Sequence, residues 1–361
     1  MQNSIEHLQN EAIGLLKQLI ATPSFSREED RSALLIEKFL KEKGIEVERH
    51  LNNVWALNQY FDPSRPTLLL NSHHDTVKPN KGYTLDPFSP VEKEGRIFGL
   101  GSNDAGGALV SIIAAFVHFY PQADLLWNLI LAASAEEEIS GRNGIESLLP
   151  QLPPVSCGLV GEPTGMQLAI AERGLLVLDG IAHGKAGHAA RGEGDNAIYK
   201  AMNDINWFRN FQFDKVSEFL GPVKMSVTSI ETENKTHNIV PSSCHFIVDI
   251  RINEHYTHEE VLQVISAHTS SEIKPRSDRL RSSMIALDHP LVQAGLALGR
   301  KYYGSPTSSD KALMPFPALK MGPGESARSH TADEFIFIDE IRQGIQLYIQ
   351  MLNRLMKRNP V

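Results

Sequence analysis

The chain has 361 residues, of which 42% are hydrophobic and 22% charged, and its formal net charge is −8 at pH 7. This length predicts about two domains, each able to bury its own core. The negative charge argues against nucleic acid and anionic membranes as partners. No secretory signal or membrane-spanning stretch is visible, so we expect a cytoplasmic protein. Its two cysteines, Cys157 and Cys244, are expected to be buried thiols.

Leucine and isoleucine recur at helical spacing over residues 3–43, which predicts two helices, and Ser26 is placed to cap the second. Short apolar runs then alternate with helical stretches up to about residue 173. This alternation predicts an α/β fold with a mixed, largely parallel sheet.

Residues 174–282 have a different order of predicted elements: strand, helix, strand, strand, helix. This order indicates an α+β, ferredoxin-like unit with an antiparallel sheet. Afterwards the alternation resumes, with helices expected over 290–303 and from about residue 339 to 355. We therefore predict one α/β domain, formed by residues 1–173 and 283–361, that is interrupted by an inserted α+β domain over 174–282.

Acidic and histidine side chains follow several of the predicted strands. In open α/β sheets, functional groups gather at the carboxyl ends of the strands. Each group alone has an ordinary explanation, such as a solvated acidic run or a turn aspartate. Their repetition at one sheet edge, together with a later histidine, favours a functional site formed by His73, His74, Asp75, Asp104, Glu136, Glu137, Glu138, Glu162 and His330.

Two histidines and at least three carboxylates, without a thiolate, are a ligand set for ions such as Zn²⁺, Mn²⁺ or Co²⁺. This set exceeds the needs of one tetrahedral ion and would suit two ions that share a carboxylate. Because residues i and i+2 of a strand point the same way, Asp75 can accept the spare N–H of His73, whereas His74 points away. Of the neighbours Glu137 and Glu138, one can bind metal while the other meets the attacking water.

Eight motifs in order resemble those of the M20 metallopeptidase family, and the match runs from about residue 10 to 355. Within that family the chain is similar to the acetylornithine deacetylase/succinyl-diaminopimelate desuccinylase group. The resemblance implies a two-zinc catalytic domain (1–173 and 283–361), in which Co²⁺ can replace Zn²⁺. It also implies a lid domain (174–282) that forms a homodimer. The motifs are HHDTV, GLGSNDAGGA, AEEEISGRNG, GEPT, GKAGHAA, HNIVP, DIR and GPG…SHTADE.

The resemblance also implies a role for each site residue. One zinc would be held by His73 and Glu162, the other by Glu138 and His330, and Asp104 would bridge them. Asp75 would orient the first histidine, and Glu137 would be the general base.

The register of the acidic run is chosen from its spacing to a glycine. A common variant of the family places a glycine six residues after the ligand glutamate, as Gly144 lies after Glu138. The alternative register, Glu136 with Glu137, has no glycine at that distance. We therefore prefer Glu137 and Glu138.

Three residues of the inserted domain receive roles from the resemblance. His188 would reach the partner subunit's site and donate to the oxyanion, and Asn238 and Arg251 would bind substrate. Arginine offers a bidentate fork for a carboxylate, although a surface ion pair on a strand is the ordinary alternative for Arg251.

The chain departs from the family pattern at three positions. Leu100 and Gly106 stand where arginine and lysine are usual, and Lys78 is inserted. None of these changes removes a metal ligand, so they bear on the subfamily and not on catalysis.

We predict hydrolysis of the amide of a small N-acyl amino acid. The leading substrate is N-acetyl-L-ornithine, in arginine biosynthesis, with N-acetyl-citrulline or an N-succinyl analogue as close relatives. The alternatives are succinyl-diaminopimelate desuccinylase and an M20-type dipeptidase or aminopeptidase. A non-catalytic metal-binding protein is disfavoured because the general base, Glu137, is present.

Overall fold

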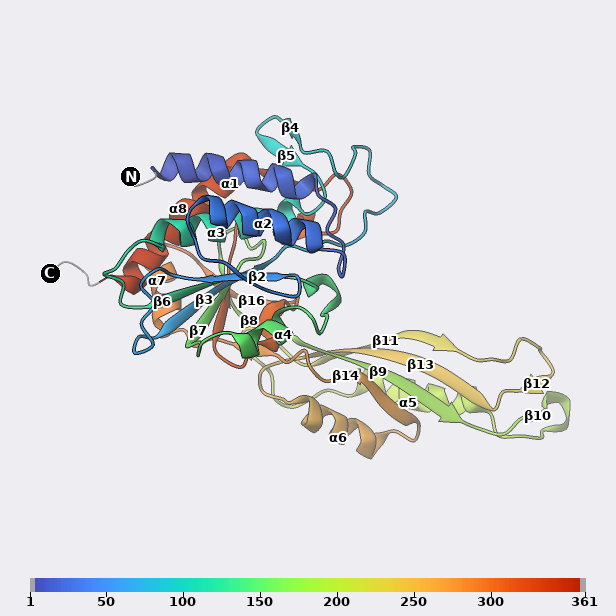
Figure 1. The fold of residues 1–361 in the computed structure, drawn as a ribbon. Coiled ribbons are helices and arrows are strands. Elements are labelled where there is room, and N and C mark those ends of the chain that lie inside the picture. The colour runs from blue at the N-terminus through green and yellow to red at the C-terminus, as the bar shows by residue number, and fades with distance from the viewer. Residues whose placement is uncertain (1–3, 358–361) are drawn as a thin grey trace. The chain divides into compact units, whose positions relative to one another are not determined.

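The computed structural model describes residues 4–357, which form two compact units (Figure 1). The larger unit comprises the chain up to Ile170, Met284–Tyr303 and the chain from Ser309 onward. The smaller unit comprises Ala171–Ser283 and Gly304–Ser308. No helix among residues 4–357 combines the length and apolar character needed to cross a lipid bilayer.

The larger unit is built on a mixed sheet, as the sequence predicts. Strand β3 runs parallel to β6 and β7, and β7 runs parallel to β17, whereas β1, β2 and β8 are joined by antiparallel pairs. The sheet order is β1 (Glu48–His50), β2 (Asn53–Leu57), β6 (Asn128–Ser134), β3 (Thr67–His73), β7 (Cys157–Val160), β17 (Ala318–Lys320), β8 (Leu168–Glu172) and β15 (Ser283–Met284), with β16 (Tyr302–Ser305) also paired to β8.

The central strands are buried along their whole length. All residues of β3, β6 and β7 are inaccessible to solvent, which explains why their sequences are continuous apolar runs without alternation. One face packs on a cluster that includes Ile145 and Leu148 of α4 (Ile145–Leu148). Cys157 lies in this core and Cys244 in the core of the smaller unit, so both predicted buried thiols are confirmed.

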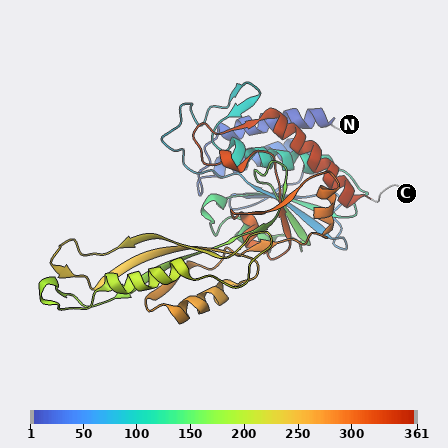
Figure 2. The same cartoon turned by 180° about the vertical axis from the view of Figure 1, so that it is seen from behind.

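Long helices cover the other side of this sheet. Figures 1 and 2 show α1 (Ile5–Ile20), α3 (Gly107–Phe119) and α8 (Ile338–Met356) packed together there, with α2 (Asp30–Glu42) beside them. Helix α3 is apolar on every side because it is buried between the sheet and its neighbours. A small sheet, β18 (Phe335–Phe337), β5 (Arg96–Phe98) and β4 (Val91–Lys93), joins the end of the chain to its first third.

The smaller unit has the predicted α+β architecture. Its antiparallel sheet has the order β11 (Lys224–Glu231), β13 (Ser243–Ile252), β9 (Gly174–His183) and β14 (Glu272–Ser277). Helices α5 (Ala197–Asn210) and α6 (His258–His268) pack on one face of this sheet (Figures 1 and 2). A two-stranded ribbon, β10 (Gly187–His188) with β12 (Ile239–Val240), extends from it.

Two local predictions were wrong, and one strand was not predicted. Ser26 does not cap α2, because its hydroxyl donates to Asp75 instead. The helix expected over 290–303 is α7 (Pro290–Leu296), which gives way after a turn at Gly299, where φ is +75°, to strand β16. Strand β14 was missed because its charged residues and Pro275 weaken the strand pattern, as is tolerated at a sheet edge.

Candidate active site

Three parallel strands bring the predicted site residues to one edge of the larger sheet. His73 ends β3 and pairs in register with Ser134 at the end of β6, and Glu137 and Glu138 follow in a short 3-10 helix. Glu162 lies two residues beyond the end of β7, on the other side of β3. Parallel strands place their carboxyl ends together, so residues remote in sequence converge there.

The side chains of this edge are close enough to share cations. His73 Nε2 lies 3.3 Å from Asp104 Oδ1, 3.8 Å from Glu162 Oε1 and 4.0 Å from Glu137 Oε2. Two overlapping groups have ligand atoms within 4.8 Å of one another: His73 with Asp104 and Glu138, and His73 with Glu137 and Glu162.

His330 joins this cluster from the loop before β18. Its Nε2 lies 3.0 Å from Glu138 Oε2 and 3.6 Å from Asp104 Oδ2. The His330 side chain is 54% exposed, whereas that of His73 is 1% exposed. The cluster is therefore closed on the side of β3 and open to solvent on the side of His330.

The cluster carries more negative charge than its imidazoles balance. Burial raises the pKa of Glu137 well above its usual value. Burial alone would lower the pKa of His73, but its hydrogen bond to Asp104 and the surrounding carboxylates raise it well above its usual value. The hydrogen bond to Glu138 raises the pKa of His330 to about 9. Such a site favours bound cations, because they would replace the protons that the buried carboxylates otherwise attract.

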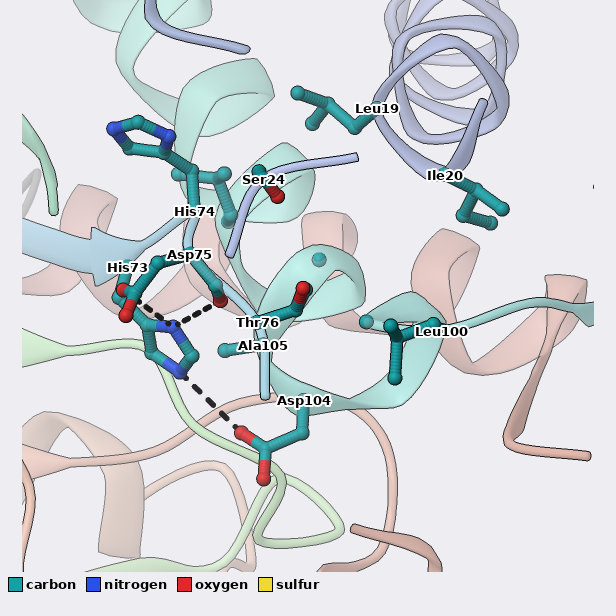
Figure 3. Close-up of a pocket in the computed structure, with 13 residues that line it drawn as sticks. Leu19, Ile20, Ser24, His73, His74, Asp75, Thr76, Leu100, Asp104 and Ala105 are labelled. Carbon is teal, nitrogen blue, oxygen red and sulfur yellow. Dashed lines mark hydrogen bonds and ion pairs between the residues drawn. The ribbon is translucent and has the colours of Figure 1, made fainter. Parts of the chain in front are cut away.

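Asp75 sits behind His73 (Figure 3). His73 Nδ1 is 3.0 Å from the main-chain oxygen of Asp75 and 3.4 Å from its carboxylate, so the main chain is the nearer acceptor. The carboxylate also accepts the N–H groups of Glu137 at 3.0 Å and Glu138 at 3.2 Å, and the Ser26 hydroxyl at 2.7 Å. Asp75 therefore contacts both the histidine and the glutamate segment.

His74 points away from the cluster (Figure 3). Its Nε2 lies 2.9 Å from the Asn52 carbonyl, which can only accept, so its Nδ1 accepts from the Ser32 hydroxyl at 2.9 Å. Burial lowers the pKa of His74 to about 4. This neutral ring holds β3 against α2 and lies outside the metal-ligand groups.

Glu136 also turns away from the cluster. Its carboxylate accepts from the Asn143 side-chain amide at 3.0 Å, and its own N–H donates to Glu29 at 3.2 Å. Of the acidic run, Glu137 lies near His73 and Glu138 near His330, and their division into base and ligand stays a prediction.

Two departures from the family pattern line one small pocket, to which Asp104 also contributes. Leu100, labelled in Figure 3, and Gly106 both contribute to its wall. A Cβ at Gly106 would lie 2.3 Å from the Gly101 carbonyl oxygen and 2.7 Å from Leu16 Cδ1. On this backbone the usual lysine therefore cannot occupy position 106.

His188, Asn238 and Arg251 belong to the smaller unit. The β10–β12 ribbon pairs His188 with Ile239, and the Asn238 carbonyl accepts the Ala189 N–H at 3.0 Å, so the His188 and Asn238 segments are neighbours. Arg251 forms a two-pronged ion pair with Asp249, at 2.8 and 3.0 Å. The roles predicted for these three residues stay predictions.

Sequence reasoning missed two buried carboxylates beside the cluster. Asp310 accepts the Ser134 hydroxyl at 2.5 Å, and burial raises the pKa of Asp310 to about 6. Glu334 is 2% exposed and accepts three main-chain N–H groups of the Asp104 segment. Both residues occur in stretches rich in polar residues, SSDK and TADE, and the second of these stretches is part of a motif already noted.

The family model for peptidase family M20/M25/M40 matches residues 69–354, which is most of the chain. The chain belongs to this family. It is an M20 metallohydrolase, and the family implies a dinuclear metal site, for which the donor groups around His73 are candidates. The family also implies a small-molecule substrate.

Curated relatives of this M20 chain include two named succinyl-diaminopimelate desuccinylase. That from Paracoccus denitrificans is 26% identical over 373 residues, covering 94% of this chain and 97% of its own length. That from Wolbachia pipientis subsp. Culex pipiens is 28% identical over 277 residues, covering 72% of this chain and 69% of its own length. The aminopeptidase PepT of Bacillus cereus shares the fold, with a TM-score of 0.76 at 18% identity over 98% of this chain and 100% of that one.

The relatives change the balance between the predicted substrates. Their names favour the desuccinylase alternative over N-acetyl-L-ornithine, and they give no specific support to arginine biosynthesis. The broader prediction, a metal-dependent hydrolase of the M20 family, is confirmed.

Proposed function

We propose that this protein hydrolyses the amide bond of an N-succinyl amino acid with the help of two Zn²⁺ ions. The observation that carries the proposal is the convergence of two imidazoles and four carboxylates at one sheet edge, within reach of one another. Nitrogen and oxygen donors without thiolate suit Zn²⁺, and Co²⁺ is a reasonable substitute.

The donor set divides naturally between two ions. His73 and Glu162 would hold one ion and Glu138 and His330 the other, with Asp104, which lies near both histidines, shared between them. Bound ions of this kind polarise an acyl carbonyl and make water a better nucleophile at neutral pH.

Glu137 is the proposed general base. Its Oε2 lies 4.0 Å from His73 Nε2, within the group of donors that also contains Glu162, and we assign it to the attacking water rather than to an ion. Glu137 would take a proton from that water and deliver it to the amine nitrogen as the amide bond breaks. A carboxylate whose pKa is raised by burial suits a group that must hold a proton between these two steps.

The succinyl group is proposed from the names of the relatives. Its free carboxylate needs a cationic partner, and we propose Arg251 of the smaller unit for this contact. His188, also of the smaller unit, is the proposed donor to the oxyanion. In the proposed assembly, a homodimer, His188 serves the partner's site.

A substrate panel tests this function. Purified enzyme loaded with Zn²⁺ or Co²⁺ is offered N-succinyl-diaminopimelate, N-succinyl-ornithine, N-acetyl-ornithine, N-acetyl-citrulline and free dipeptides, and amine release is measured. We expect turnover of the succinyl amides and loss of activity after chelation, with recovery when metal is returned. A preference for acetyl amides would instead favour N-acetyl-L-ornithine, the leading substrate predicted from the sequence. Turnover of dipeptides alone would make the protein a peptidase.

A further inference from the structure

Glu334 connects two segments that each carry a proposed metal ligand. It follows His330 by four residues and precedes β18, whose residue Phe335 pairs with Phe98 of β5. The Glu334 carbonyl extends this ladder by accepting the Gly99 N–H at 2.9 Å. The strand pairing therefore lays the segment after β5, which leads to Asp104, alongside the segment that follows His330.

The Glu334 carboxylate continues the connection into the Asp104 turn. Its Oε1 accepts the N–H groups of Asn103 at 2.8 Å and Asp104 at 2.9 Å, and its Oε2 accepts the Gly101 N–H at 3.1 Å. Because the side chain is only 2% exposed, water cannot replace these bonds.

A second link supports the same pairing of segments. The Asn103 side chain donates to the Glu325 carbonyl at 3.1 Å and accepts the Glu325 N–H at 3.0 Å. The turn between these links is unusual, since His330 has φ +59° and Asp333 has φ +52°, a region that residues other than glycine rarely adopt. Such a conformation persists when its surroundings fix it on several sides.

We propose that Glu334 is a positioning residue of the metal centre, which sets the distance between Asp104 and His330 by holding the main chain of the Asp104 turn. The proposal rests on the two-ion function described above. Glu334 touches neither substrate nor metal in this role. It acts through main-chain N–H groups, so that both proposed ions depend on it through the shared ligand Asp104.

Asp333 provides a matched control. This neighbouring carboxylate also accepts three bonds, from the N–H and hydroxyl of Thr84, at 2.9 and 2.6 Å, and from the Leu85 N–H at 3.0 Å. The segment that it holds carries no proposed metal ligand. Removing the Asp333 carboxylate frees the segment at Thr84 and Leu85. Only the removal of the Glu334 carboxylate frees the turn that carries Asp104.

The experiment compares Glu334→Ala, Glu334→Gln and Asp333→Ala in the full-length protein. Zn²⁺ affinity is measured by competition with a chromophoric chelator, and the absorption spectrum of the Co²⁺-loaded protein reports ligand geometry. We expect Glu334→Ala to weaken metal binding about 10- to 100-fold, the usual effect of removing a group that orients ligands, and to change the Co²⁺ spectrum. Asp333→Ala should retain the wild-type affinity and spectrum.

Glu334→Gln keeps the experiment decisive if the alanine variant does not fold. Its amide oxygen can still accept the Asn103 and Asp104 N–H groups, while its NH₂ group faces the Gly101 N–H. We therefore expect an affinity between those of wild type and Glu334→Ala. Wild-type affinity and spectrum in the folded Glu334 variants, or equal losses in Asp333→Ala, would overturn the inference. Wild-type protein that binds fewer than two ions would instead count against the proposed function.

Discussion

The substitution Asp75→Asn tests how the site is held together behind His73. The Asp75 carboxylate is buried and accepts the N–H groups of Glu137 and Glu138 on different oxygens, Oδ1 and Oδ2. An asparagine has only one oxygen. In either orientation its NH₂ group therefore meets the N–H of one of the two glutamates, and that buried donor loses its partner.

The cost follows from this count of bonds. One unpaired buried N–H and the loss of charge from the remaining bonds cost about 3 kcal/mol. For a unit of this size, about 2–4 °C in Tm corresponds to each kcal/mol, so we expect the metal-free variant to melt ~6–12 °C below wild type. The glutamate segment would also shift, and Zn²⁺ affinity should fall about 10- to 100-fold.

Thermal unfolding followed by circular dichroism, and chelator competition for Zn²⁺, measure the two effects. Ser26→Ala is the control, because it removes the 2.7 Å hydroxyl bond to Asp75 and leaves both glutamate N–H groups paired. We expect this control to lose about 1 kcal/mol and to keep its metal affinity. If Asp75→Asn behaved like Ser26→Ala in both measurements, the proposed role of the carboxylate in holding Glu137 and Glu138 would be refuted.

Three further predictions concern the proposed roles. Metal analysis of the loaded wild type should approach two ions per chain, and Asp104→Ala should lose most of both; one ion fully retained would argue against a shared ligand. Glu137→Gln should lower kcat at least about 10²-fold with metal content preserved, whereas Glu138→Gln should also lose metal. If the two variants showed the opposite phenotypes, the assignment of base and ligand in the acidic run would be wrong by one residue. Co-expressed His188→Ala and Glu137→Gln chains should recover about a quarter of wild-type activity, since half the dimers would have one complete site of two; no recovery despite subunit exchange would exclude a shared site.

Much of the architecture follows from the sequence because burial leaves a strong pattern. The strands that meet at the site are buried on both faces, so each is a continuous apolar run that ends abruptly in polar residues, as β3 does at His73. Those endings are informative because a parallel sheet brings them together whatever the length of chain between them. The inserted unit is equally visible, since β13 alternates buried and half-exposed residues along its length.

Edges and helix ends leave weaker patterns. Strand β14 contains a proline and has no buried residue, so it forms by pairing with β9 rather than through its own composition. Residues 297–303 follow α7 directly, but Gly299 adopts a left-handed conformation and Tyr302 pairs into the sheet instead. Pairing with distant strands decides the structure of both segments, and a short window of sequence does not contain the information about this pairing.

The groups that position the site are the hardest to predict, for a physical reason. Asp75 and Glu334 act on main-chain N–H groups, which every residue except proline carries, so the sequence at positions 101, 103 and 137 gives no sign of the bond. A metal ligand must be one of a few residue types, but the peptide group that a buried carboxylate holds can belong to any residue. Only the fold, which brings residue 334 beside residue 101, identifies such contacts, and mutations of the carboxylate are the means to measure them.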